Sequence, residues 1–215
     1  MEIIKTNFKY ARPLIPLDPN RVTIIFIHHT MAKKSTPEQI HQWHLSNGWR
    51  GFGYNEYIRK DGTVYIGRGD NIGAQTENHN SISYGIAFEG SYDVEPSPTN
   101  EQYRWIATRV LETQKRFPKA TTVIPHSSRN NTSCPGKNFN MGKLYDAINQ
   151  LVEEHEKVEE AKTEHYAEEI HKELIEDYGL TIHEKRYDDK ITRGESMALL
   201  LQALKSIKKY IDSSL

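Results

Sequence analysis

The sequence is poor in cysteine and has no long apolar run. Its single cysteine, Cys134, cannot form a disulfide within the chain, which excludes a small scaffold held together by disulfides. The longest apolar stretch, residues 22–27, is far shorter than the roughly 20 residues that span a bilayer. The N-terminal segment lacks the apolar run of a signal peptide, so we expect synthesis in the cytoplasm without ordinary export. With 215 residues, the chain can still bury a core without covalent support.

The net charge of -1 conceals two parts of opposite charge. Residues 1–152 hold 18 Lys and Arg against 13 Asp and Glu, whereas residues 153–215 hold 10 against 16. Such asymmetry suggests two units with different roles. We therefore predict a domain at 1–152, a charged helical linker at 153–163 and a small helical unit at 164–215.

Strand and helix patterns are interspersed in the first part, which predicts an α/β fold with a mixed central sheet flanked by helices. Predicted strands cover residues 22–27, 54–60, 63–67, 83–88 and 123–124. Asp61 and Gly62 suggest a two-residue hairpin turn between the second and third of these strands. Predicted helices cover residues 35–47, 100–117 and 142–152. The first begins at a capping box over residues 35–38, and Gly48 ends it.

The second part predicts two helices around a loop. The first covers residues 164–178, and the second begins at a capping box over residues 192–195 and reaches about residue 211. A unit of this size has a core too small to be stable alone. We expect it to pack on the first domain or on a copy of itself.

Two histidines and the cysteine suggest a metal site. His28 and His29 end the apolar strand, and because successive side chains point to opposite faces, only one of them can face a given site. Seven residues separate His126 from Cys134, in a loop rich in Gly, Pro, Asn and Ser. One strand histidine with these two residues makes a His₂Cys set with an open fourth position, typical of catalytic zinc. On spacing alone, the alternative is a buried apolar cysteine with histidines that serve as ordinary polar groups.

Six segments in order resemble a known family. They are residues 24–30, 48–55, 61–68, 73–74 and 83–90, and finally His126 with residues 134–136 (Cys-Pro-Gly). The sequence is similar over about residues 10–150 to the zinc-dependent N-acetylmuramoyl-L-alanine amidases of type 2. These share their fold with peptidoglycan recognition proteins. The resemblance implies hydrolysis of the amide between N-acetylmuramic acid and L-alanine in bacterial peptidoglycan.

The resemblance also implies roles for particular residues. His28, His126 and Cys134 match the positions of the zinc ligands, so the implied cofactor is Zn²⁺. Zinc lowers the pKa of the water that it binds to about 7 and polarises the scissile carbonyl. Cys134 is then a thiolate ligand rather than a nucleophile.

Three further residues receive implied catalytic roles. Tyr54 is the expected hydrogen-bond donor to the oxyanion, and Glu89 is the expected general base. Other members carry their acid two residues earlier, where this chain has Ala87, and residues two apart share a strand face. Thr132 stands where some members have a lysine, and its hydroxyl could substitute.

Several residues outside this set allow two interpretations. His41 and His44 lie one turn apart on the first predicted helix and could bind a second metal, but packing or hydrogen bonding at the sheet edge is favoured. Trp49, Arg50 and Asn55 flank Tyr54 and could line a glycan or peptide groove, although Trp49 could equally be part of the core.

Arg68 follows a predicted strand and could either bind a peptide carboxylate or form a structural ion pair. The sequence pattern does not separate these two roles.

The leading functional hypothesis is a phage or prophage endolysin that acts on the cell wall after release. Residues 179–195 weakly resemble one S-layer homology unit, which suggests a Gram-positive host and binding of a secondary cell-wall polymer through residues 164–215. The same unit could mediate oligomerisation. We expect no nucleic-acid partner and no membrane insertion. The alternatives are a non-catalytic peptidoglycan recognition module, against which Cys134 argues, and a bacterial autolysin or recycling amidase.

Overall fold

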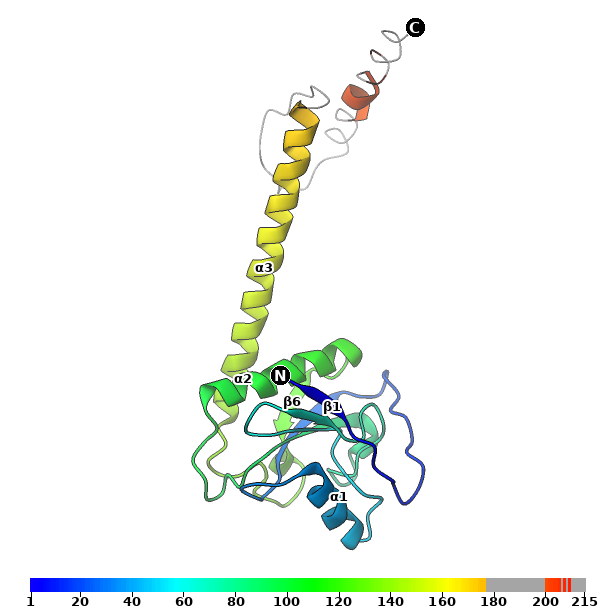
Figure 1. Ribbon diagram of the computed structural model, residues 1–215, viewed down its shortest axis with the longest axis vertical. Helices are drawn as coiled ribbons and strands as arrows, with labels where there is room; N and C mark the ends of the chain where they lie inside the picture. The colour runs from blue at the N-terminus through cyan, green and yellow to red at the C-terminus, as the bar shows by residue number, and fades with distance from the viewer. Residues whose placement is uncertain (177–199, 206, 208, 210–215) are drawn as a thin grey trace. The chain divides into compact units, whose positions relative to one another are not determined.

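The computed structural model describes residues 1–176, 200–205, 207 and 209. The chain divides into two compact units, Met1–Val152 and Glu153–Leu215. The first unit holds all the strands of the described residues and two complete helices (Figure 1). The predicted capping box at 192–195 and the S-layer-like segment at 179–195 lie outside the described residues.

A six-stranded sheet forms the centre of the first unit, in the order β1-β4-β3-β5-β2-β6. Its strands are β1 (Ile3–Lys5), β2 (Ile24–His29), β3 (Glu56–Ile58), β4 (Val64–Ile66), β5 (Ser83–Phe88) and β6 (Thr122–Pro125). Only the β3–β4 pair is antiparallel. The predicted mixed sheet is therefore confirmed, with β1 as an edge strand that the sequence pattern did not indicate. In β2 and β5 every residue is buried, which explains why neither strand alternates apolar residues with exposed charged ones.

Helices cover both faces of this sheet. Helix α1 (Pro37–Ser46) places Ile40 against Tyr57 and Ala87 on one face. Helix α2 (Asn100–Arg116) contributes an apolar stripe to the larger core on the other face. That core includes Ile25 and the first turns of α3. Figure 1 shows α1 and α2 on opposite sides of the strands.

The structure corrects two local predictions. The capping box of α1 is formed by Thr36 and Gln39, one residue later than predicted, because the Thr36 hydroxyl accepts from the Gln39 amide. The hairpin between β3 and β4 has a three-residue loop, closed by a hydrogen bond from Arg59 N to Thr63 O of 2.9 Å. Gly62 has a φ of 86° there, as a three-residue loop requires. Gly48 does end α1 in the way predicted, with a φ of 75°.

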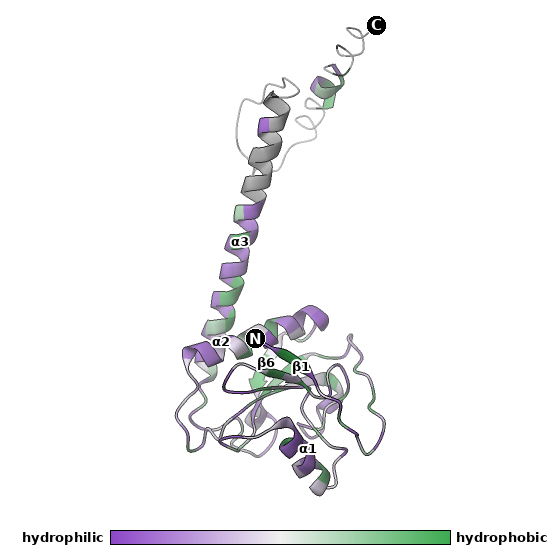
Figure 2. Cartoon of the chain, viewed as in Figure 1, coloured by the Kyte–Doolittle hydropathy of each residue, from purple (hydrophilic) through white to green (hydrophobic). Residues whose placement is uncertain are grey.

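Helix α3 (Met141–Glu176) is one continuous helix across residues for which separate segments were predicted. Within the first unit, Leu144 and Ala147 of this helix are buried in the core. Figure 2 shows hydrophobic residues in these first turns and mostly hydrophilic residues in the turns that follow. Among the described residues, no helix combines the length and the apolar character needed to cross a membrane.

Candidate metal centre

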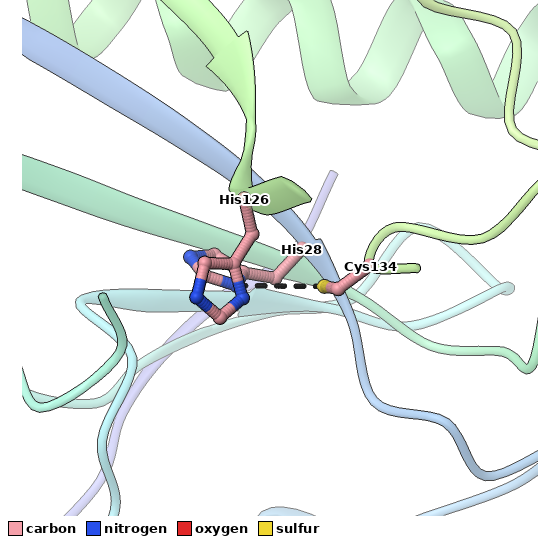
Figure 3. Close-up of side chains that lie close together, drawn as sticks. All are labelled: His28, His126 and Cys134. Atoms are coloured by element: carbon pink, nitrogen blue, oxygen red, sulfur yellow. Dashed lines mark hydrogen bonds between the residues drawn. The ribbon is translucent and has the colours of Figure 1, made fainter. Parts of the chain in front are cut away.

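Three side chains from separate segments converge beside the sheet. His28 lies near the end of β2, His126 directly follows β6, and Cys134 lies in the loop after it. One nitrogen from each histidine and the cysteine sulfur all lie within 4.8 Å of one another. Figure 3 shows the three side chains pointing toward one another. Because β2 and β6 are adjacent parallel strands, their carboxyl ends bring the two histidines to the same edge.

Hydrogen bonds fix which atoms face the centre of this cluster. Gln75 Oε1 lies 2.5 Å from His28 Nε2, while His28 Nδ1 lies 3.6 Å from Cys134 Sγ. If Nε2 carries the proton, it donates to Gln75 and Nδ1 keeps a free lone pair for a metal. Asn130 Oδ1 holds His126 Nε2 in the same way at 3.0 Å. Gln75 and Asn130 lie in loops without periodicity, so the sequence pattern gave no signal for these supporting roles.

The electrostatics of the cluster favour neutral nitrogen ligands. Burial lowers the pKa of His28 to about 3, and the nearby His126 adds to this effect. Burial also lowers the pKa of His126 and raises that of Cys134 to about 12. A dication placed among these atoms would reverse the last shift, because a coordinating thiol is deprotonated. Two imidazoles and one sulfur are donors that suit zinc, and they leave a fourth position for water or substrate.

His29 takes no part in this cluster, in agreement with the alternation of strand side chains. Its ring stacks on Tyr92, and its Nδ1 accepts a hydrogen bond from the Tyr92 amide at 3.1 Å. The backbone amide of His29 instead points at Cys134 Sγ, at 3.4 Å. This amide would stabilise a thiolate, so His29 supports the cluster through its main chain.

Tyr54 lies beside the cluster, at the entrance to β3. Its ring centroid is 5.2 Å from that of His28. Burial raises the pKa of Tyr54, and the charge on Cys134 raises it further, so the phenol keeps its proton. Among the described residues, no hydrogen-bond acceptor for this hydroxyl is found, which leaves it available to a bound substrate.

Glu89 is held by other parts of the chain. Its carboxylate accepts hydrogen bonds from the amides of Ser35 at 2.9 Å and Lys60 at 3.1 Å, and it lies 3.7 Å from Arg59 Nε. It is not among the three residues that form the cluster within the described chain. A carboxylate with these partners joins two loops, so its contacts favour a structural role over the expected role of general base.

Thr132 also has a local partner. Its hydroxyl accepts a hydrogen bond from the backbone amide of Cys134 at 3.2 Å. This contact shapes the loop that carries the Cys134 sulfur. The expected catalytic role of the Thr132 hydroxyl stays a prediction.

Comparisons with known proteins agree with this geometry. A family model described as N-acetylmuramoyl-L-alanine amidase matches residues 18–137, which include the whole cluster. The chain belongs to this amidase family. The resemblance deduced from the six sequence segments is therefore confirmed.

Relatives of the amidase domain include phage and animal proteins. The endolysin of Enterobacteria phage K11 is 33% identical over 110 residues, covering 47% of this chain and 73% of that protein. Peptidoglycan-recognition protein SC2 of Drosophila melanogaster is 32% identical over 132 residues, covering 56% and 71%. The solved structure of the amidase LysC from Clostridium intestinale matches with a TM-score of 0.64 and 31% identity, covering 69% of this chain and 98% of that one.

The two histidines of α1 hold the segment that leads to Tyr54. His41 Nδ1 accepts from the Phe52 amide at 3.0 Å, and His44 Nδ1 accepts from the Gly53 amide at 2.8 Å. These bonds agree with the favoured interpretation of hydrogen bonding near the sheet. Both histidines therefore position the amidase site without being part of the metal cluster.

Asn55 and Trp49, two of the residues predicted to line a groove, differ in their exposure to solvent. Asn55 is fully buried and structural: its amide donates to Gly69 O and Asn71 O and accepts from the Gly85 amide. Trp49 is 47% exposed and is therefore not a core residue.

Proposed function

We propose that this amidase-family chain hydrolyses the bond between N-acetylmuramic acid and L-alanine in peptidoglycan, with zinc held by His28, His126 and Cys134. The convergence of these three side chains carries the proposal. A binding module needs no such donor set, whereas a hydrolase does. When bound, zinc would supply Lewis acidity and water activated at neutral pH.

The chain's own residues orient the metal ligands and supply a hydrogen-bond donor to the substrate. Gln75 and Asn130 hold the two imidazoles, each through one ring nitrogen. The Tyr54 hydroxyl, protonated and without a partner in the described chain, donates a hydrogen bond to the scissile carbonyl oxygen as negative charge develops on it. A donor that meets its partner only in the transition state raises kcat rather than tightening substrate binding.

Lysis of purified cell walls tests this function. Full-length protein should clear walls and release new L-alanine amino termini without new reducing ends. Chelation should abolish this activity, and added zinc should restore it. The rate of wall lysis by Cys134→Ser should be at least about 100-fold lower than that of the wild type, because the variant binds the metal weakly. The exposed Ser128→Ala, in the same loop region, is the matched control and should keep full activity. Lysis that survives both chelation and Cys134→Ser would overturn the zinc mechanism.

We also propose that the protein is a phage or prophage endolysin. Its similarity to the endolysin of phage K11 supports this role. The Gram-positive host and the binding of a secondary wall polymer by residues 164–215 rest on the S-layer-like segment alone. Pull-down with walls stripped of secondary polymer would test that part: equal retention on stripped and intact walls would exclude polymer binding.

A further inference from the structure

The segment that carries Cys134, residues 133–138, lies directly against the connection between β5 and α2. A Cβ atom added to Gly136 would stand 2.5 Å from the carbonyl carbon of Tyr92, so only glycine allows this approach. The φ of Gly136 is 104°, which also favours glycine. Two residues further on, the Asn138 amide donates to Tyr92 O at 2.9 Å. The two segments therefore meet through their main chains.

Asp93 joins the same two segments with its side chain. Its Oδ2 accepts a hydrogen bond from the Ser133 hydroxyl at 2.8 Å, and its Oδ1 accepts one from the Lys137 amide at 3.2 Å. One carboxylate thus binds the chain immediately before Cys134 and again three residues after it. Hydrogen bonds to an ionised acceptor are stronger than those between neutral groups.

The Asp93 carboxylate also faces the ring of His29. Its Oδ2 lies 4.0 Å from His29 Nε2, which is buried and has no hydrogen-bond partner among the described residues. The other ring nitrogen accepts from the Tyr92 amide, so in the neutral ring the proton is on Nε2, the nitrogen nearer to Asp93. Attraction between this N–H group and the carboxylate favours the orientation of Asp93 that reaches Ser133.

The main chain of Cys134 has its other hydrogen bonds within its own loop. The Cys134 carbonyl accepts from the Ser127 amide at 2.9 Å, and its amide donates to the Thr132 hydroxyl at 3.2 Å. These bonds shape the loop but do not connect it to another part of the chain. Asp93 comes from a separate connection, so it fixes where the loop lies.

We propose that Asp93 is a positioning residue for the metal centre, which holds the segment that brings Cys134 Sγ to the two histidines; this proposal rests on the proposed function. Asp93 is not one of the three residues of the cluster and acts through Ser133 and Lys137. Loss of a group that orients a metal ligand typically costs about 10- to 100-fold in affinity. Asp93 bonds to neighbours of the ligand rather than to the ligand itself, so we expect the lower end of this range.

Zinc affinity of the full-length protein, measured by competition with a chromophoric chelator, tests the proposal. Asp93→Ala should lower the affinity about tenfold. Asp93→Asn should stay within about threefold of the wild type, because its amide can accept from Lys137 and donate to Ser133. Asp146→Ala removes an exposed aspartate of α3 and should leave the affinity unchanged. Affinity that falls equally in Asp93→Asn and Asp93→Ala would assign the effect to charge and overturn the positioning role.

A double-mutant cycle shows whether Asp93 acts through the sulfur ligand. In the Cys134→Ser background, Asp93→Ala should cause no further loss of zinc affinity, because the ligand that Asp93 positions is already absent. The same fold loss in both backgrounds would overturn the proposal.

The reactivity of Cys134 in the metal-free protein provides a readout that needs no zinc. Cys134 is 5% exposed and is the only cysteine of the chain, so its reaction with a thiol reagent reports on this segment alone. Asp93→Ala should raise the reaction rate by about tenfold, because release of the segment exposes the sulfur, whereas Asp93→Asn should not. Ser133→Ala, an exposed change that removes one of the two hydrogen bonds, should raise it less. Urea denaturation of each metal-free variant establishes that it is folded.

The outcomes separate Asp93 from the proposed function. Wild type that binds zinc no more tightly than a folded Asp93→Ala would overturn the role of Asp93 and leave the amidase function intact. Wild type that binds no zinc would overturn the proposed function, and the thiol reaction then decides whether Asp93 holds the segment. Equal thiol reaction rates in wild type and Asp93→Ala would show that it does not.

Discussion

At the scale of single residues, the side chains that hydrogen-bond to the histidines of the metal cluster should affect zinc binding, as the ligands themselves do. Gln75 is buried, and its amide bridges His28 and the Ser83 hydroxyl. We expect Gln75→Ala to weaken zinc binding by about 10- to 100-fold, because His28 loses the partner that fixes its ring. Competition with a chromophoric chelator measures this affinity. The exposed Gln42→Ala is the control, and equal zinc affinity in both variants would contradict the role of Gln75.

Tyr54 should affect the reaction and not the metal. Tyr54→Phe removes a single hydroxyl that no described residue engages, so we expect kcat to fall by about 100-fold with zinc affinity unchanged. Steady-state kinetics on a soluble muramyl peptide measure the effect. Tyr145→Phe removes the hydroxyl that donates to Val123 O and should leave kcat unaltered. A rise in KM alone after Tyr54→Phe would indicate a binding role instead.

The motifs predicted which residues meet, but not what holds them. His28, His126 and Cys134 lie close together, because the ends of two adjacent parallel strands place the two histidines and the loop after β6 brings Cys134 to them. Glu89 shows the limit of strand periodicity. Its expected role as general base stays a prediction, but the amides of Ser35 and Lys60 that its carboxylate accepts from lie in distant loops, and no local pattern reveals such contacts.

At the scale of secondary-structure elements, one buried ion pair ties α2 to the sheet. Glu56 of β3 is fully buried and accepts from Arg109 Nε at 2.7 Å and Nη2 at 2.8 Å. Arg109→Met should lower the free energy of unfolding by about 3 kcal/mol, since it leaves a buried carboxylate with fewer partners. Urea denaturation measures this change. Lys115→Met, which breaks an exposed pair on the same helix, should cost less than about 1 kcal/mol.

The contact between α1 and the segment before Tyr54 should depend on pH. Burial lowers the pKa of His44 to about 4, and the positive charges of Arg68 and His41 add to this effect. The unfolded chain binds this proton near pH 6.5, so between pH 6.5 and 4 it holds more protons than the folded chain. Stability should therefore fall as the pH drops through this range, by up to about 1.4 kcal/mol per pH unit.

The variant His44→Asn isolates this contribution. An asparagine carbonyl can replace Nδ1 as the acceptor for Gly53 but does not titrate. Urea denaturation at pH 7 and pH 5 should show a smaller loss of stability in His44→Asn than in wild type. The same loss in both proteins would show that other groups cause the pH dependence.

Elements with strong local signals were predicted closely, and those that depend on distant partners were not. Strand β5 matches its predicted bounds, and α2 ends where Pro118 requires. Strand β1 has only three residues, of which two are exposed, and it exists because it pairs with β4. Such an edge strand carries no periodic pattern long enough to recognise.

At the scale of the whole chain, the opposite charges of the two units lead to a testable difference in wall association. The unit 1–152 carries an excess of five positive charges, since 18 basic residues stand against 13 acidic ones. Long-range attraction to an anionic wall should therefore be stronger for a chain that ends at Val152 than for the full chain, whose net charge is -1.

Ionic strength separates this attraction from specific contacts. The shortened chain keeps the buried apolar residues Leu144 and Ala147, so we expect it to fold and to cleave a soluble muramyl peptide within about twofold of the full chain's rate. Its binding to walls should weaken steeply between low and physiological salt, because exposed charges are screened over about 8 Å at 0.15 M. The full chain should show a shallower dependence. If the full chain binds more tightly at every salt concentration, residues 153–215 add specific wall contacts that outweigh their unfavourable charge.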